Sequence, residues 1–279
     1  MKKIIVAFDG LKYSSGTRDF AINVAKETQT HLVGVFMDDP TYTSYKIYEL
    51  IAEQGVSEEK LNKYKLKDDA TREAAAADFE KTCKHSGIEF SVHHDHNIAI
   101  QDLKHESIYA DMIIINVKET LTHYNEKLPT RFIRDLLSDT QCPVLIVPQK
   151  YKPINKVILL YDGEPSSVHA IKMFSYLMPN MMELETEVIS VNPVYTTLHM
   201  PDNKLMKEYM RRHYPKAKYT VMKGLAETEI VNYLKLSTEN TLVVLGAYRR
   251  GSISRWFRES MADVLMREVK LPLFIAHNK

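Results

Sequence analysis

The sequence predicts an α/β protein made of two Rossmann-like domains, each an open parallel sheet of five strands with flanking helices. Two observations carry this prediction. The chain of 279 residues contains an internal repeat, and in each copy short apolar runs alternate with segments of helical periodicity. Apolar runs without a polar face are typical of strands that are buried on both sides, as in a parallel sheet covered by helices.

The repeat is clearest where each copy begins. The first copy starts with KKIIVAFDGLKYSSGTRDFAINVAKE at 2–27, and the second starts with NKVILLYDGEPSSVHAIKMFSYLMPN at 155–180. Each contains an apolar strand, the pair Asp-Gly, a Ser-Ser pair and an amphipathic segment. The first strands are therefore expected to end at Asp9 and Asp162, in a turn that leads into a helix.

The later elements follow in the same order in both copies. The second strands lie in HLVGVFMDDP at 31–40 and TEVISVNPV at 186–194, and the fourth strands in ADMIIINV at 110–117 and NTLVVLGA at 240–247. The closing strands lie in CPVLIVPQK at 142–150 and LPLFIAHNK at 271–279. The first copy is longer, and its surplus falls at 42–87, where the sequence predicts a helix with a loop. We expect domains at 1–150 and 151–279, joined near the two prolines of PQKYKPIN at 148–155.

Net charge, the first apolar run and the cysteines indicate which partners and which cellular compartment to expect. The formal net charge is +1, so no overall field favours nucleic acid or an anionic membrane as a partner. The first apolar run, IIVAF at 4–8, is too short for a signal peptide or a membrane span, which predicts a cytoplasmic protein. Cys83 and Cys142 give neither a disulfide framework nor metal-type spacing, so both are expected to be reduced packing residues.

The order of these motifs, repeated twice, resembles the universal stress protein family in its two-domain form. The resemblance is carried by VAFDGLKYSS at 6–15, LLYDGEPSS at 159–167 and GAYRRGSISRWFRESMADVLMREVKLPLFIAH at 246–277. It implies a Rossmann-like five-stranded fold, cytoplasmic residence and a role in stress survival. It also implies that the strands VLIVP at 144–148 and LFIAH at 273–277 pair, so that the two domains form an intramolecular pseudo-dimer.

Members of this family that bind ATP share a loop of Gly, two residues, Gly, nine residues, Gly, and then Ser or Thr. Glycines let backbone N–H groups approach phosphate oxygens, and the following helix N-terminus favours negative charge. In the second domain Gly246 and Ser260 match this loop, whereas Arg249 and Glu259 replace its second and third glycines. The resemblance therefore implies a candidate site for ATP or AMP, formed by Asp162, Gly163, Val191, Gly246, Arg249, Gly251, Ser252 and Ser260.

The same residues also fit a purely structural interpretation. Asp before Gly is good turn chemistry whatever the ligand, and a glycine-capped turn before a basic helix face needs no phosphate. In the first domain the corresponding loop, 116–137, contains no glycine, and Asn116 occupies its first position. Glu119 and Glu126 add negative charge there, so we expect no nucleotide in this half and interpret Asp9 as a turn residue.

Other polar clusters indicate no metal and no catalytic centre. In HHDHN at 93–97 a strand would place His94 and His96 on one face and His93 and Asp95 on the other, which is too few ligands for zinc. Basic residues at 211–223 are interpreted as a solvated face. The sequence has no Gly-x-Ser-x-Gly elbow, no Walker loop and no His-pair zinc motif, so we expect a protein that is not an enzyme, with slow ATP hydrolysis left open.

Two classes of function fit these residues. The first is a non-catalytic regulatory or interaction module of the stress response, which acts on protein partners without a nucleotide. The second is a switch in which the second domain binds an adenine nucleotide and changes its affinity for a partner. A third and weaker alternative is another small molecule in the crevice of the first domain, with the insertion as a lid. The sequence names neither the stress nor the partner, and leaves a homodimer of tandem chains open.

Overall fold

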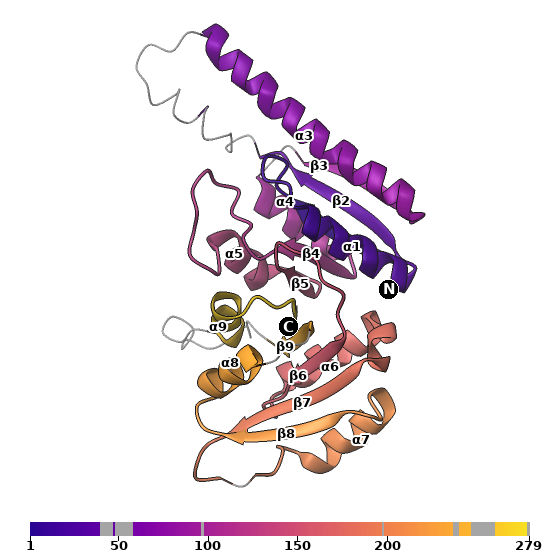
Figure 1. The fold of residues 1–279 in the computed structure, drawn as a ribbon, viewed down its shortest axis with the longest axis vertical. Coiled ribbons are helices and arrows are strands. Elements are labelled where there is room, and N and C mark those ends of the chain that lie inside the picture. Colours follow the sequence, from indigo (N-terminus) through magenta and orange to yellow (C-terminus); the bar gives the residue numbers. More distant parts are fainter. Residues whose placement is uncertain are drawn as a thin grey trace. The chain divides into compact units, whose positions relative to one another are not determined.

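The computed structural model describes residues 1–39, 47, 58–95, 98–196, 198–236, 240–246 and 260–277. By its internal contacts the chain divides into two compact units, residues 2–141 and residues 142–279. Each unit is an α/β layer structure with helices against a sheet (Figure 1).

The sheet of the first unit has four parallel strands in the order β3-β2-β1-β4. These strands are β1 (Lys3–Phe8), β2 (His31–Met37), β3 (Phe90–Asp95) and β4 (Met112–Asn116). The helices are α1 (Ser15–Thr28), α3 (Glu58–Ser86), α4 (Ala99–Glu106), the 3-10 turn η1 (Ser107–Tyr109) and α5 (Arg131–Asp139). Strands β2 and β3 are added on one side of β1, and β4 is added on its other side, so the strand order reverses between β1 and β4. Ligands of such folds bind at the carboxyl ends of the strands beside this reversal point.

The second unit has six strands in the order β5-β10-β9-β6-β7-β8. They are β5 (Val144–Val147), β6 (Lys156–Leu160), β7 (Glu185–Asn192), β8 (Lys218–Lys223), β9 (Thr241–Gly246) and β10 (Leu273–Ala276). Its helices are α6 (Pro165–Leu177), the 3-10 turn η2 (Pro179–Glu183), α7 (Asn203–His213), α8 (Ala226–Leu236) and α9 (Met261–Glu268). Here the strand order reverses between β6 and β9.

The predicted α/β class with two parallel five-stranded repeats is confirmed. The pairings among β1–β4 and among β6–β10 are parallel, and β5 joins β10 antiparallel, with Leu145 opposite Phe274. The closing strand of the first repeat therefore pairs with the closing strand of the second, as the pseudo-dimer interpretation requires. For this reason β5 is grouped by contacts with residues 142–279, although by repeat it ends the first copy.

The cores consist of the apolar strand runs that the sequence showed. Strand β4 is buried along its whole length, and in β1 only Lys3 is partly exposed. Burial of apolar side chains on both faces of these strands is the main force that holds each sheet between its helices.

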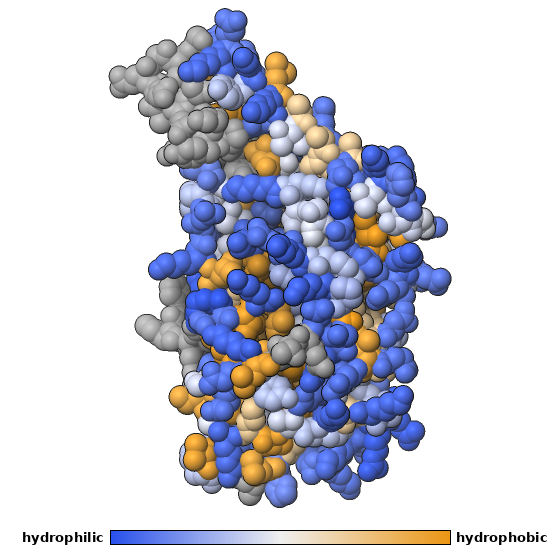
Figure 2. All heavy atoms as spheres, in the orientation of Figure 1, coloured by the Kyte–Doolittle hydropathy of each residue, from blue (hydrophilic) through white to orange (hydrophobic). Residues whose placement is uncertain are grey.

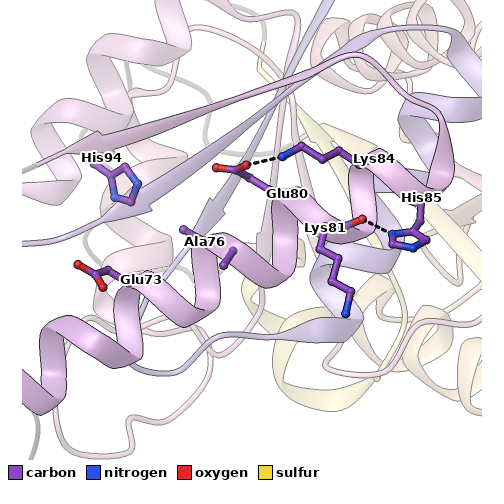
Figure 3. Close-up of a pocket in the computed structure, with 8 residues that line it drawn as sticks. Glu73, Ala76, Glu80, Lys81, Lys84, His85 and His94 are labelled. Carbon is purple, nitrogen blue, oxygen red and sulfur yellow. Dashed lines mark hydrogen bonds and ion pairs between the residues drawn. The ribbon is translucent and has the colours of Figure 1, made fainter.

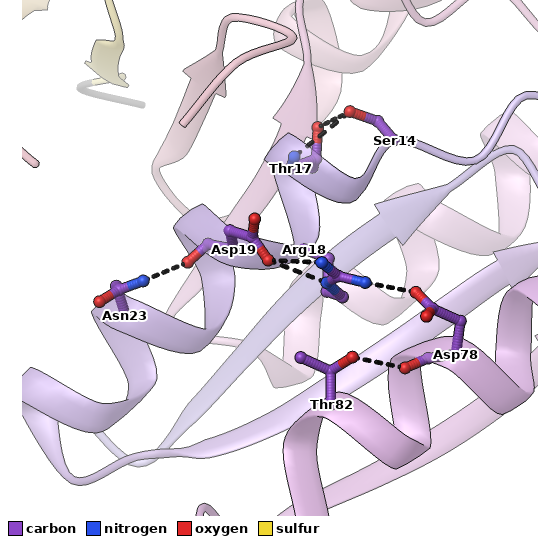
Figure 4. A network of polar contacts seen from close by, with 7 residues as sticks. All are labelled: Ser14, Thr17, Arg18, Asp19, Asn23, Asp78 and Thr82. Carbon is purple, nitrogen blue, oxygen red and sulfur yellow. Dashed lines mark hydrogen bonds and ion pairs between the residues drawn. The ribbon is translucent and has the colours of Figure 1, made fainter. Parts of the chain in front are cut away.

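The predicted helical surplus of the first copy is present as α3. This helix has 29 residues, whereas α7, which follows the second strand of the other repeat, has 11. Phe79 docks α3 on the sheet and lies so close to Gly34 of β2 that a Cβ atom there would be 2.6 Å from the ring. Arg18 of α1 also pairs with Asp78 of α3 (Figure 4). The part of the predicted surplus at 42–46 and 48–57 lies outside the described residues.

Candidate functional site

Three of the predicted nucleotide-site residues lie at one edge of the second unit. Asp162 follows β6, Val191 lies near the end of β7, and Gly246 ends β9. The parallel register pairs Leu160 with Ile189, and Leu159 with Val244, so all three strands end on the same side of the sheet. The structure thus brings these three positions together at the carboxyl edge, beside the reversal point.

Asp162 already has an internal role in the turn that precedes α6. Its Oδ1 accepts hydrogen bonds from the backbone N–H of Glu164 at 2.9 Å and from the Ser167 hydroxyl at 2.7 Å. These contacts form an Asx-type turn that leads into α6, a usual role of an Asp side chain before a helix. The residue is exposed, so its carboxylate also faces solvent.

Gly246 and Gly163 are glycines for local steric reasons. A Cβ atom at Gly246 would lie 2.4 Å from the backbone oxygen of Ser166 and 2.9 Å from the nitrogen of Ser167, so β9 ends directly against the start of α6. Gly163 has φ +86°, a left-handed conformation that costs side-chain residues energy, and a Cβ atom there would lie 2.7 Å from the side chain of Pro201. Both glycines are explained without a ligand.

Ser260 is the N-cap of α9, where its hydroxyl accepts a hydrogen bond from the Asp263 N–H at 3.2 Å. In the first unit Thr130 caps α5 in the same way, with its hydroxyl accepting from Ile133 N–H at 3.2 Å. Thr130 and Ser260 therefore occupy equivalent helix starts in the two repeats. The remaining predicted site residues, Arg249, Gly251 and Ser252, lie outside the described residues.

In the first unit Asn116 takes the position that Gly246 has in the second. Its amide Nδ2 donates to the hydroxyls of Thr17 at 3.0 Å and Ser14 at 3.3 Å, which lie at the start of α1. Its Oδ1 accepts from the Lys118 N–H at 2.9 Å. A hydrogen-bonded side chain thus joins strand and helix where the second unit uses close backbone contact.

Two buried carboxyl groups lie at the reversal point of the first unit. Asp9 is 1% exposed, and its Oδ1 accepts from the N–H of Leu11 at 2.8 Å, as the turn interpretation predicts. Glu119 follows β4, and its Oε1 accepts from the N–H of Thr120 at 3.0 Å and of Leu121 at 3.4 Å. Burial, and secondly the negative charge of Asp9, raise the pKa of Glu119 to about 8. The pair can hold a proton at neutral pH and presents acceptors rather than phosphate donors.

The long helix α3 covers the neighbouring strand ends. Arg72 lies over Gly10, where a Cβ atom would be 2.9 Å from its Cγ, and its Nε lies 3.2 Å from Asp38 Oδ1. The Nδ1 atom of His94 lies 3.2 Å from the other oxygen of Asp38. This part of the crevice is therefore filled by a bridge of the chain's own side chains from α3, the end of β2 and β3.

The histidine-rich stretch does not gather into one cluster. His93 contacts Glu106 of α4 at 2.7 Å and His94 contacts Asp38, so neighbouring histidines point to opposite faces of β3, as alternation predicts. No group of three His, Cys, Asp or Glu side chains is placed to hold a metal ion in the part of the chain that the structure describes. His96 lies outside that part.

A surface hollow of about 510 Å³ lies between α3 and His94 (Figure 3). Its charged groups partly neutralise one another, since Lys84 pairs with Glu80 at 3.0 Å. Nearby, Cys83 is fully buried, and burial raises the pKa of its thiol to about 12. A protonated, inaccessible thiol is a packing residue and a poor nucleophile, in agreement with its interpretation from the sequence.

Sequence reasoning missed two features of the first crevice. Glu119 was recognised as a negative charge in the loop, but nothing in its neighbours along the chain shows that it is buried beside Asp9. Arg72 lies in a helical run whose composition favours helix alone, so its position over Gly10 depends on how α3 docks. The length of the insertion was the one available signal that something covers this crevice.

The fold of the whole chain matches solved structures. A universal stress protein from Archaeoglobus fulgidus has a TM-score of 0.72 at 14% identity, over 99% of this chain and 98% of that chain. A protein of unknown function from Pseudomonas aeruginosa has a TM-score of 0.64 at 14% identity, over 99% and 92%. Another from Pseudomonas aeruginosa, provisionally assigned to the universal stress proteins, has a TM-score of 0.60 at 15% identity, over 99% and 93%.

No family model matches the sequence, and no curated protein matches it significantly. The likeness is therefore one of structure at low identity. The chain has the fold of the universal stress proteins, and it has this fold along nearly its whole length. None of the described helices is long and apolar enough to cross a membrane.

Proposed function

We propose that the chain is a tandem universal stress protein that acts as a non-catalytic regulatory or interaction module, without a bound nucleotide in either domain. One observation carries the proposal. At the carboxyl edge of the second sheet these residues are engaged in contacts within the chain: Asp162 holds the turn before α6, Ser260 caps α9, and Gly246 lies against the backbone of α6.

The chemistry of the first crevice supports the same conclusion. A phosphate group needs N–H donors or cations around it, and the space beside β1 and β4 instead holds the buried carboxyl groups of Asp9 and Glu119. Arg72, whose side chain lies over Gly10, is engaged with Asp38. A nucleotide in this unit would have to displace these contacts.

An adenine nucleotide, ATP or AMP, in the second domain is the second candidate. It is favoured by the convergence of Asp162, Val191 and Gly246 at one edge beside the reversal point, and by the exposure of the Asp162 carboxylate. In this version Arg249 would contact phosphate, and the module would change its affinity for a partner when the nucleotide binds.

The experiment is extraction of the freshly purified protein under denaturing conditions with mass spectrometry, together with calorimetric titration of ATP. We expect no co-purified nucleotide and no heat of binding. A substitution at Gly246 is unsuitable as a probe, because any side chain there meets the backbone of Ser166 and perturbs the fold.

Arg249→Gln is the informative variant, and Arg134→Gln is its control, because Arg134 is an exposed arginine of the first unit. If ATP gives a heat of binding that is lost in Arg249→Gln and kept in Arg134→Gln, the proposal of a nucleotide-free module is wrong. The nucleotide switch is then the better account. Phosphate release from ATP, measured on the same samples, tests the proposed lack of catalysis.

A further inference from the structure

We propose that the second unit docks an acidic protein segment on the exposed face of α7, and this proposal rests on the interaction role proposed above. The surface consists of five cationic side chains from α7 and the turn that follows it, called here the α7 basic surface: Lys204, Lys207, Arg211, Arg212 and Lys216. Its charge, its exposure and a leucine beside it define the chemistry of the partner.

The α7 basic surface concentrates charge in a chain that is nearly neutral. The whole chain has a formal net charge of +1. Residues 203–218, in contrast, hold six Lys or Arg and a single acidic residue, Glu208. All five members of the surface are exposed. Over α7 the space-filling view is mostly hydrophilic (Figure 2).

Helix geometry aligns part of this charge. Lys204, Lys207 and Arg211 are spaced three and four residues apart, which puts them on one side of α7. At 1.5 Å per residue the row is about 10 Å long. Met206 and Met210 of the same helix are buried, so the row lies away from the face that packs on the sheet. Tyr219 of β8, an edge strand, is 38% exposed and lies within electrostatic reach of Arg211.

These cations have no internal counter-charge among the described residues, in contrast to four lysines elsewhere in the chain. Lys84, Lys156, Lys218 and Lys235 each pair with a glutamate at 2.7 to 3.1 Å. The α7 basic surface, by contrast, makes no ion pair with any residue that the structure describes. A concentration of unneutralised charge attracts an oppositely charged surface and speeds its association.

An exposed leucine selects protein over nucleic acid as the partner. Leu205 is 67% exposed and lies seven residues before Arg212, on the same side of the helix, with the carboxylate of Glu208 between them. An apolar side chain contributes nothing to phosphate binding, whereas it fits a segment that alternates acidic and apolar residues. Pairing of the segment with the edge of β8 is disfavoured by the lysines at its two ends, Lys218 and Lys223.

The test measures fluorescence anisotropy of a fluorescein-labelled peptide of Glu-Glu-Leu repeats, titrated with the full chain at low and at physiological salt. We expect binding that weakens as salt rises, and a loss of roughly tenfold or more in affinity for Lys207→Glu/Arg211→Glu. Lys63→Glu/Lys67→Glu is the matched control, because it reverses two exposed cations at the same spacing on α3. Circular dichroism checks that both variants are folded.

A second variant tests the leucine. Leu205→Ser is expected to weaken binding of the Glu-Glu-Leu peptide and to leave binding of a Glu-Glu-Ser peptide unchanged. Equal losses in the α7 and α3 double variants, or tighter binding of single-stranded polyuridylate than of the peptide, would overturn the proposal. The ATP titration described above does not involve this surface, so its result distinguishes failure of the docking proposal from failure of the proposed function.

Discussion

At the scale of single residues, Glu119 makes the stability of the first unit depend on pH. Its pKa is raised from 4.5 to about 8 in the folded chain, chiefly by burial, so the folded state holds a proton that the unfolded state releases earlier. The contribution of Glu119 to the free energy of unfolding should therefore be largest at and below pH 4.5, and it should fall as pH rises toward about 8. Glu119→Gln, which is neutral and keeps the oxygen that accepts from Thr120, should remove this fall.

Thermal unfolding followed over this range of pH checks the prediction. The midpoint of Glu119→Gln should exceed that of the parent chain near pH 8, and the two should converge toward pH 4.5. Glu126→Gln is the control, because Glu126 lies in the same loop and accepts the Arg131 N–H in a solvent-exposed hydrogen bond. Parallel pH profiles for the parent and Glu119→Gln would show that the buried pair does not control stability.

Gly246 and Gly10 offer a second comparison of single residues. A methyl group at 246 meets backbone atoms of Ser166 at 2.4 Å and Ser167 at 2.9 Å, whereas the nearest atom to one at Gly10 is the side-chain Cγ of Arg72 at 2.9 Å. Gly246→Ala should therefore lower the free energy of unfolding by about 1–3 kcal/mol, the usual range for an overpacked site. Gly10→Ala should cost clearly less. Urea denaturation measures both, and equal losses would contradict this account of Gly246.

At the scale of elements, the start of α9 depends on Ser260. Replacing an N-cap serine by alanine leaves a backbone donor unsatisfied, so Ser260→Ala should cost about 1 kcal/mol. Ser260→Asp keeps the capping oxygen and should restore stability, although a carboxylate would repel phosphate. Urea denaturation of the three chains checks this. If alanine and aspartate were equally destabilising, the serine hydroxyl would have a role other than capping.

These elements show what the sequence can predict and where it stops. The strands, the extra helix and the turn at Asp9 follow from local patterns: apolar runs, helical composition and Asp-Gly chemistry. The sequence pattern singles out Gly246 and Ser260, but their spacing could not show whether backbone contact and capping, or a phosphate, requires them. The burial of Glu119 and the position of Arg72 depend on docking of distant segments, and no local pattern encodes it.

At the scale of the whole molecule, the repeat in the sequence and the contacts in the structure divide the chain at different places. Counting repeats assigns β5 to the first copy, because its residues correspond to those of β10. It pairs, however, with β10 itself, and Leu145 is fully buried opposite Phe274. Strand β5 thus belongs to the first copy by its place in the repeat, but its contacts group it with the second unit.

This difference predicts which strands lose protection from amide hydrogen exchange when a cavity is made in β5. Leu145→Ala removes a buried side chain and should cost about 2–5 kcal/mol. Because β5 pairs with β10, amide hydrogen exchange should become faster in β10 and β9, while β2 and β3 keep their protection. Leu32→Ala is the matched control: the same buried residue type in β2 should speed exchange in β1 and β3 instead. Faster exchange confined to β1–β4 in Leu145→Ala would place β5 energetically with its own repeat, and the division at residue 142 would then describe contacts alone.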